Sequence, residues 1–357
     1  MTPPRRVLVV GAGLAGARCA ETLRANGFDG ELRIVGAEPV PPYERPALSK
    51  EHLAGERDAA SLELRPRAFW EEHEIELLLS RRVVSWDART RTATTGRGEE
   101  LAWDALVLAT GATPRMLPGW EHAHVLRTLA DAARLRQRLS PGARVAVVGA
   151  GFVGTEVAST ALALGCSVQL LDVAPAPLER VLGPEVGALL AARYTDAGVE
   201  LRLGAPVDPA QLEADAVLLA VGVTVDPIPT DACGRTETPG VYAAGDVAEA
   251  WHPLLGRPLR VEHWTSAAGQ GAAVAHAILG KERPHAALPY FWSDQFGLRL
   301  QYVGHAERWD KVEVDGEPGS FVARYRERGR TVAALAVNRP AEVGKLRTEL
   351  AQLPIAA

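Results

Sequence analysis

The sequence predicts an α/β fold with two parallel-sheet domains, because one composite pattern occurs twice along the 357 residues. Residues 11–16 read Gly-Ala-Gly-Leu-Ala-Gly, and residues 149–154 read Gly-Ala-Gly-Phe-Val-Gly. Each glycine motif directly follows an apolar run, 7–10 or 145–148, that is typical of a buried parallel strand. Each motif also precedes a stretch with helical character. A strand, a GxGxxG turn and a helix in this order indicate two Rossmann-like dinucleotide-binding domains.

The three glycines of each motif have separate physical roles. The first permits the tight turn after the strand, the second lets the backbone approach a pyrophosphate, and the third allows the helix to pack closely on the strand. The N-terminus of the helix then faces the phosphates. The residues that we expect at the two pyrophosphates are Gly11, Gly13, Leu14, Ala15, Gly16, Gly149, Gly151, Phe152, Val153 and Gly154.

Each motif is followed by a second strand that ends near an acid. The predicted helices cover 14–26 and 152–164, and the strands after them lead to Glu38 and Asp172. Both acids lie roughly 20–27 residues after the first glycine, near the spacing of a carboxylate that binds a ribose. Two dinucleotides in one chain are most simply explained by electron transfer between a bound flavin and a visiting nicotinamide.

The rest of the chain completes these domains and adds a third. Strands are expected at 75–86, 91–95, 104–108, 216–222 and 240–243, and helices at 128–139 and 266–279. After 285 the sequence alternates strands (301–304, 321–325 and 331–337) with turns, and a helix is expected at 342–353. We therefore expect a discontinuous first dinucleotide-binding domain (1–112 and 226–284), a second dinucleotide-binding domain (113–225) and a C-terminal α+β domain (285–357).

Composition narrows the class of protein. A hydrophobic content of 47% and a charged content of 23% are those of a globular protein. The net charge of −5 argues against nucleic-acid binding. No apolar run reaches the ~20 residues of a membrane span, and the first strand begins too early for a signal peptide. We expect a cytoplasmic protein that contacts neither nucleic acid nor membrane.

The three cysteines, Cys19, Cys166 and Cys233, exclude one kind of chemistry. They form neither a CxxC pair nor a metal cluster, so no metal is expected. A flavoprotein that reduces disulfides needs a redox-active cysteine beside the flavin. The corresponding region, 42–50, contains none. Electrons are therefore expected to leave the flavin directly.

Together these residues resemble the FAD-dependent NAD(P)H:ferredoxin reductases, a family of two-dinucleotide-binding flavoproteins. Besides the two fingerprints, the motifs that carry the resemblance are 43–46 with 48–50, 109–111, 245–247 and 292–295. The resemblance covers nearly the whole chain. It implies that NADH reduces FAD, and that FAD reduces a [2Fe–2S] ferredoxin serving a cytochrome P450 or a ring-hydroxylating dioxygenase.

The resemblance also implies roles for single residues. Glu38 would bind the adenosine ribose of FAD. Lys50 would lie by the reactive edge of the flavin and pair with Glu156, and Trp292 would lie against the flavin or the partner; these three are the candidate catalytic residues. The further implied cofactor contacts are Arg45, Val83, Ala109, Thr110, Gly111, Arg127, Gly222, Gly245, Asp246, Glu262, His263, Trp264 and Ala267.

Charge suggests which cofactor and partner the chain prefers. Asp172 would accept hydrogen bonds from both ribose hydroxyls and repel a 2′-phosphate, which favours NADH over NADPH; Arg180 would weaken this preference if it folds back. Ferredoxins of this kind are acidic and bind transiently, so we expect a basic docking face on this chain. The candidates are Arg299, Arg308 and Lys311, or Arg324, Arg326, Arg328 and Arg330. We expect a monomer or a weak homodimer.

Two segments, 204–214 and 224–230, are short compared with the family that the chain resembles. They put the stability of the NADH-binding domain in question, while the fingerprint and Asp172 are intact. Two alternative functions stay open. One is an NADH oxidase. The other is an NADH-sensing signalling flavoprotein resembling the apoptosis-inducing factors, which slow reduction by NADH would favour.

Overall fold

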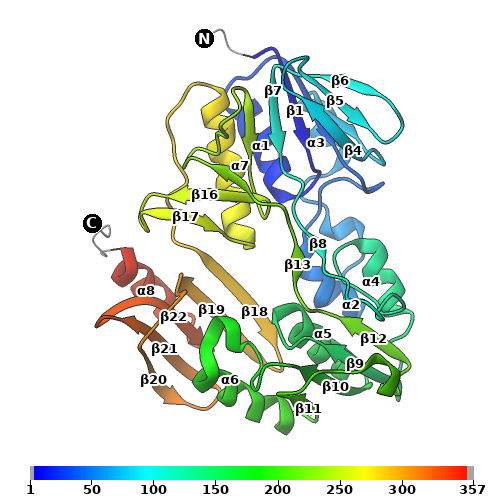
Figure 1. The fold of residues 1–357 in the computed structure, drawn as a ribbon, viewed down its shortest axis with the longest axis vertical. Helices are drawn as coiled ribbons and strands as arrows, with labels where there is room; N and C mark the ends of the chain where they lie inside the picture. The colour runs from blue at the N-terminus through cyan, green and yellow to red at the C-terminus, as the bar shows by residue number, and fades with distance from the viewer. Residues whose placement is uncertain (1–3, 352–357) are drawn as a thin grey trace.

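The computed structural model describes residues 4–351 and places them in two α/β units and a C-terminal sheet (Figure 1). The first sheet is entirely parallel, in the order β15-β7-β1-β2-β3. Its strands are β1 (Arg6–Val10), β2 (Glu31–Val35), β3 (Ile75–Leu78), β7 (Ala105–Leu108) and β15 (Val241–Ala243). Because β15 pairs with β7, this sheet combines two distant parts of the chain.

Helices α1 (Leu14–Ala25) and α7 (Trp264–Ile278) pack against each other beside this sheet. Small residues permit the close approach, since a Cβ at Gly271 would lie 2.2 Å from the carbonyl oxygen of Ala15. The surrounding elements are η1 (Arg45–Ser49), α2 (Glu51–Ala54), η2 (Ala60–Leu62), α3 (Arg67–Glu72) and an antiparallel sheet of β4 (Val83–Asp87), β5 (Thr92–Thr95) and β6 (Glu100–Ala102).

The second unit is a four-stranded parallel sheet in the order β11-β10-β9-β12. Its strands are β9 (Arg144–Val148), β10 (Ser167–Asp172), β11 (Glu200–Leu203) and β12 (Ala216–Leu219), and its helices are α4 (Leu129–Arg136), α5 (Phe152–Ala163) and α6 (Glu179–Asp196). An antiparallel ribbon of β8 (Thr113–Pro114) and β13 (Val223–Thr224) connects it to the first unit.

The two short segments are continuous and contain little regular structure. Residues 204–214 include only the turn η3 (Pro209–Gln211), and 224–230 run from β13 into β14 (Ile228–Thr230). β14 pairs with β16 (Ala248–His252), which pairs with β17 (Arg257–Arg260). Trp120, which is 6% exposed, packs with Val148, Leu171 and Leu219 on one face of the second sheet.

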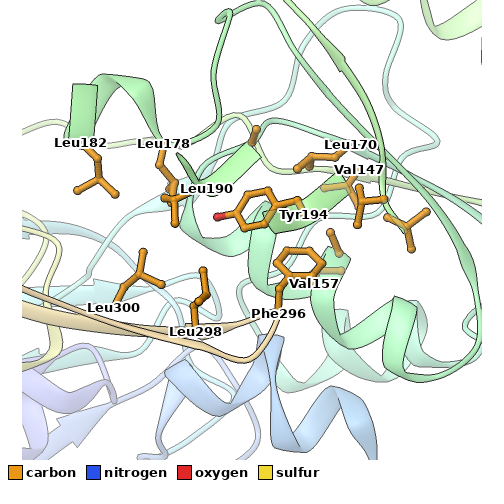
Figure 2. Close-up of a cluster of buried hydrophobic side chains, with 14 of the residues drawn as sticks. Val147, Val157, Leu170, Leu178, Leu182, Leu190, Tyr194, Phe296, Leu298 and Leu300 are labelled. Atoms are coloured by element: carbon orange, nitrogen blue, oxygen red, sulfur yellow. The ribbon is translucent and has the colours of Figure 1, made fainter. Parts of the chain in front are cut away.

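The C-terminal unit is a five-stranded antiparallel sheet in the order β18-β19-β22-β21-β20. Its elements are β18 (Tyr290–Gln295), β19 (Leu298–Gly304), β20 (Lys311–Glu317), β21 (Ser320–Glu327), β22 (Arg330–Val337) and α8 (Glu342–Ala351). One hydrophobic core joins this sheet to the second unit, and Figure 2 shows Phe296 and Leu298 of the β18–β19 hairpin facing Tyr194 of α6. The ring centroids of Tyr194 and Phe296 are 4.4 Å apart.

Several element boundaries differ from the expected ones. The stretch 75–86 is two strands of different sheets, because the backbone turns at Ser80, where φ is +55°. α4 ends at Arg136, three residues before the expected end of its helix. The helix expected from 266 begins at Trp264, so this residue lies inside α7 rather than before it. α8 matches the expected 342–353 helix through Ala351, and the last two positions lie outside the described residues. Within residues 4–351, no helix is long and apolar enough to cross a membrane.

Candidate functional site

A pocket of about 680 Å³ lies where the three units meet. Its walls come from the first fingerprint, η1, the start of α5, the start of α7 and β18. The predicted site residues that line it are Gly11, Gly13, Leu14, Ala15, Glu38, Arg45, Lys50, Val83, Ala109, Thr110, Gly111, Arg127, Phe152, Val153, Glu156, Gly245, Asp246, Glu262, His263, Trp264, Ala267 and Trp292.

The first fingerprint has the geometry that a bound pyrophosphate requires. A Cβ at Gly11 would lie 2.0 Å from the carbonyl oxygen of Ala109, and one at Gly16 would lie 2.2 Å from that of Gly11. These two glycines therefore serve the tight turn and the close packing of α1. A Cβ at Gly13 would meet nothing within 4 Å, so the backbone there is open to a ligand. The pocket thus fits a dinucleotide such as FAD.

The second fingerprint repeats this geometry. A Cβ at Gly149 would lie 2.4 Å from the carbonyl oxygen of Ala220, and one at Gly154 would lie 1.9 Å from that of Gly149. A Cβ at Gly151 would meet nothing. Because Phe152 and Val153 also line the large pocket, the start of α5 faces both dinucleotide sites. Two dinucleotides bound in this way would approach each other at the pocket.

Lys50 and Glu156 form an ion pair in the lining of the pocket. The Lys50 Nζ lies 2.8 Å from the Glu156 Oε2, and their side chains are only 13% and 7% exposed. The hydroxyl of Ser49 donates to the same carboxylate oxygen. The pairing that the resemblance implied is therefore present, across 106 residues of sequence.

A second group of charges surrounds the part of the pocket next to the first sheet. Arg45 donates to Glu38 (2.7 Å), and the Tyr43 hydroxyl donates to the other oxygen of Glu38 (2.7 Å). Arg127 forms an ion pair with Asp246 (2.7 Å). These cations and hydrogen-bond donors can neutralise phosphate or hold ribose hydroxyls.

Aromatic side chains from the start of α7 and from β18 also line the pocket. The rings of Trp264 and Trp292 meet edge to face, with centroids 6.1 Å apart. His263 lies 4.8 Å from the Phe291 ring, measured between centroids. Burial, with the nearby His305, lowers the pKa of His263 to about 4. This imidazole is therefore neutral near pH 7, and it adds no positive charge to the pocket.

Asp172 lies at the carboxyl end of β10, beside the second fingerprint. Its two carboxylate oxygens accept hydrogen bonds from the backbone N–H groups of Ala150 (2.6 Å) and Ala174 (2.9 Å). Each oxygen keeps a lone pair for a ribose hydroxyl. The carboxylate thus joins the fingerprint turn to the position expected for the nicotinamide-dinucleotide ribose.

The structure separates some predicted residues from this arrangement and adds others. Gly222 follows β12 near the second fingerprint, whereas Arg180 is exposed in the first turn of α6. The sequence analysis did not single out Ser49 and Phe291, which line the pocket. It also missed Ser293, which donates a hydrogen bond to Glu156 but does not line the pocket among the described residues. Ser49 stands inside the quoted motif 48–50, but a serine carries no charge pattern that would single it out.

The fold and the site define a protein of the two-dinucleotide class, in which two βαβ fingerprints face one pocket. A family model described as "Pyridine nucleotide-disulphide oxidoreductase" matches residues 5–271, and one described as "Reductase C-terminal" matches 290–353. The chain belongs to the pyridine nucleotide-disulphide oxidoreductase family and carries its reductase C-terminal domain. The three cysteines are all buried, and none is among the described residues that line the pocket.

Similar proteins are ferredoxin reductases. The chain is 35% identical to the ferredoxin–NAD(+) reductase component of the p-cumate 2,3-dioxygenase system of Pseudomonas putida. The alignment covers 96% of this chain and 92% of the relative. It is 35% identical to putidaredoxin reductase from the same organism (94% and 89%). A solved complex of putidaredoxin reductase with putidaredoxin superposes with a TM-score of 0.92 at 34% identity (97% and 93%). The resemblance, the fold class and the oxidoreductase class are confirmed.

The comparisons also bear on the short segments. The alignment with the p-cumate reductase component extends over 373 residues, more than the 357 residues of the whole chain. This chain therefore lacks residues that the relative has. The shortening expected at 204–214 and 224–230 stays a prediction.

Proposed function

We propose that the chain is a cytoplasmic, FAD-dependent NADH:ferredoxin reductase. The observation that carries the proposal is that both fingerprints, the Lys50–Glu156 pair and several aromatic side chains meet at one pocket, whose described lining contains no cysteine. A pocket of this kind can bring two dinucleotides together but offers no thiol to accept their electrons. The names of the similar reductases give ferredoxin as the partner in the p-cumate system and putidaredoxin as the partner of putidaredoxin reductase.

The residues have the following roles in this proposal. The first fingerprint holds the FAD pyrophosphate, with Glu38 at the adenosine ribose and Asp246 with Arg127 beside the phosphates. The second fingerprint and Asp172 hold NADH. The chemistry that FAD would supply when bound here is the acceptance of a hydride and the release of single electrons. Lys50 would supply positive charge to stabilise a flavin that becomes negative on reduction, and Trp292 with Trp264 would shield that part of the pocket from water.

The docking face for the ferredoxin belongs to the proposal as well. Arg324 pairs with Glu349 and Arg326 pairs with Glu313, so two arginines of the β21–β22 hairpin are already neutralised. In the C-terminal sheet, β20 is the edge strand opposite β18, which carries Trp292, and β21 is the neighbour of β20. A docking face that includes Arg299 and Arg308 is therefore the better candidate. The expected oligomeric state, monomer or weak homodimer, stays a prediction.

Stopped-flow reduction of the flavin-loaded protein tests the proposal. NADH should bleach the flavin rapidly, and a [2Fe–2S] ferredoxin should then reoxidise it promptly. Bleaching by NADPH should be slower, because Asp172 repels the 2′-phosphate. A flavin that NADH reduces slowly, or that oxygen reoxidises faster than any ferredoxin does, would instead support the signalling or oxidase function.

A further inference from the structure

Glu156 is held by polar side chains from separate parts of the fold. Its Oε2 accepts hydrogen bonds from Lys50 (2.8 Å) and from the hydroxyl of Ser49, which is the last residue of η1; Lys50 follows it. Its Oε1 accepts a hydrogen bond from the Ser293 hydroxyl on β18 (2.6 Å). The carboxylate itself belongs to α5 and is 6% exposed. One buried carboxylate thus joins the two dinucleotide-binding units to the C-terminal sheet.

The hydrogen bonds continue beyond Ser293 into the core. The amide Nε2 of Gln295 donates to the Ser293 Oγ (2.9 Å), and the Tyr194 hydroxyl donates to the Gln295 Oε1 (2.7 Å). Ser293 and Tyr194 are 0% exposed, and Gln295 is 3% exposed. Figure 2 shows the Tyr194 ring enclosed by apolar side chains of α5, α6 and β19. Bulk water therefore does not reach this row of side chains.

Glu156 fixes the donor and the acceptor in each hydrogen bond that links Ser293, Gln295 and Tyr194. Ser293 has a single hydrogen, which it gives to the carboxylate, so its oxygen must accept from the Gln295 amide. The Gln295 carbonyl then faces Tyr194, whose hydroxyl must donate. Burial, together with the negative charge of Glu156, raises the pKa of Tyr194, so this hydroxyl keeps its proton. All donors in this row therefore point toward the Glu156 carboxylate.

Successive side chains of β18 point to opposite faces of the strand, so Trp292 and Ser293 have different surroundings. Trp292 lines the pocket, and its neighbour Ser293 points to the other side of the strand, toward α5. Among the described residues that line the pocket are Lys50 and Glu156, but not Ser293. Ser293 can therefore act on a bound flavin only through the carboxylate that it holds.

We propose that Ser293 is a positioning residue, through which the C-terminal sheet fixes the Glu156 carboxylate against Lys50 and so sets the charge beside the flavin. This inference rests on the proposed function, because it needs FAD in the main pocket. Without the hydroxyl, Oε1 would be a buried acceptor with no donor. The negative charge of Glu156 would be less compensated, and the reduced, anionic flavin would be less stable.

The midpoint potential of the bound flavin tests this inference. It is measured at pH 8 by photoreduction against a redox dye, with neither NADH nor ferredoxin present. Ser293→Ala should shift the potential to a more negative value, and Ser293→Thr, which keeps a hydroxyl, should restore it. In a Glu156→Gln background, Ser293→Ala should cause no further shift, because the charge on which it acts is gone. An unchanged potential in Ser293→Ala would overturn the inference.

A matched control comes from the same two elements. The Ser159 hydroxyl of α5 accepts a hydrogen bond from the backbone N–H of Phe296 (2.8 Å), at the end of β18. Ser159→Ala removes a contact between α5 and the β18–β19 hairpin without touching Glu156, so it should leave the potential unchanged. An equal shift in Ser159→Ala would mean that the effect comes from a loosened interface, and would contradict a specific role for Ser293.

Two further measurements separate the possible failures. If Ser293→Ala does not retain flavin, Tyr194→Phe removes only the last hydroxyl of the row; a smaller shift in the same direction supports the inference, and none overturns it. In the wild-type protein, failure of NADH to reduce the flavin would reject the proposed function. The potentials would still decide the role of Ser293, because photoreduction needs no NADH.

Discussion

The buried ion pair at the pocket is the residue-scale feature with the largest energetic consequence. Lys50→Met should lower the free energy of unfolding by about 3 kcal/mol, because it leaves the Glu156 carboxylate buried without its cation. Urea unfolding monitored by circular dichroism measures the change. The control is Lys345→Met, since Lys345 is 76% exposed in its pair with Glu342 and should change stability by less than about 0.5 kcal/mol. Similar losses in both variants would contradict the expectation.

Asp172 should decide between the two nicotinamide cofactors. Asp172→Asn keeps one acceptor oxygen but loses the charge that repels a 2′-phosphate, so kcat/KM for NADH should fall about tenfold and that for NADPH should fall less. Steady-state kinetics with both cofactors gives the ratio. Asp215→Asn is the control, because Asp215 bonds to the backbone of Arg144 in the same domain, away from the fingerprint. A ratio unchanged in Asp172→Asn would refute this role.

Two histidines make stability depend on pH. Burial lowers the pKa of His263 and of His285 to about 4, below the value of about 6.5 expected in the unfolded chain. The unfolded state therefore takes up protons first. Their contribution is complete above about pH 6.5 and is lost as the pH falls toward 4. Urea unfolding between pH 8 and 4.5 should show this loss, with a shallower slope in His285→Gln. An identical slope in the variant would exclude His285.

At the scale of elements, Gly154 and Gly151 of the second fingerprint should affect different properties: the first the stability of the fold, the second the binding of NADH. Gly154→Ala places a methyl group 1.9 Å from the backbone oxygen of Gly149, so α5 must move away from β9, at a cost of about 2 kcal/mol. The methyl group of Gly151→Ala has no neighbouring protein atom within 4 Å, so this variant should leave stability unchanged. It should raise KM for NADH, because the methyl group lies where the pyrophosphate approaches. Thermal unfolding and NADH titration of both variants check this; a normal KM in Gly151→Ala would be the contrary result.

The elements also show why sequence reasoning succeeded in some places and failed in others. β1 and β9 were predicted because strands buried on both faces are continuous apolar runs. β18 was missed because its inward positions include Ser293 and Gln295, which break the apolar alternation. These polar side chains face inward because they bond to Glu156 and Tyr194, which lie far away in the sequence. Only the folded chain reveals such partners.

At the scale of the molecule, the second unit and the C-terminal sheet share one hydrophobic core (Figure 2). Phe296→Ala should cost about 3–5 kcal/mol, because the ring is 7% exposed and packs against Tyr194. Hydrogen exchange should show α6 and β19 losing protection together. Phe69→Ala is the control, since Phe69 lies in the first unit and should leave that protection intact. Loss of protection in β19 alone would show that the core is not shared.

The pairing of β15 with β7 has a consequence for how the chain folds during synthesis. A ribosome delivers the chain from its N-terminus, so β9 to β12 have all emerged once residue 219 is out. The first sheet must still wait for β15 at 241–243, and α1 must wait for α7. The inserted unit can thus complete its sheet before the unit that surrounds it in sequence. The FAD-binding sheet, although it begins first, is finished second.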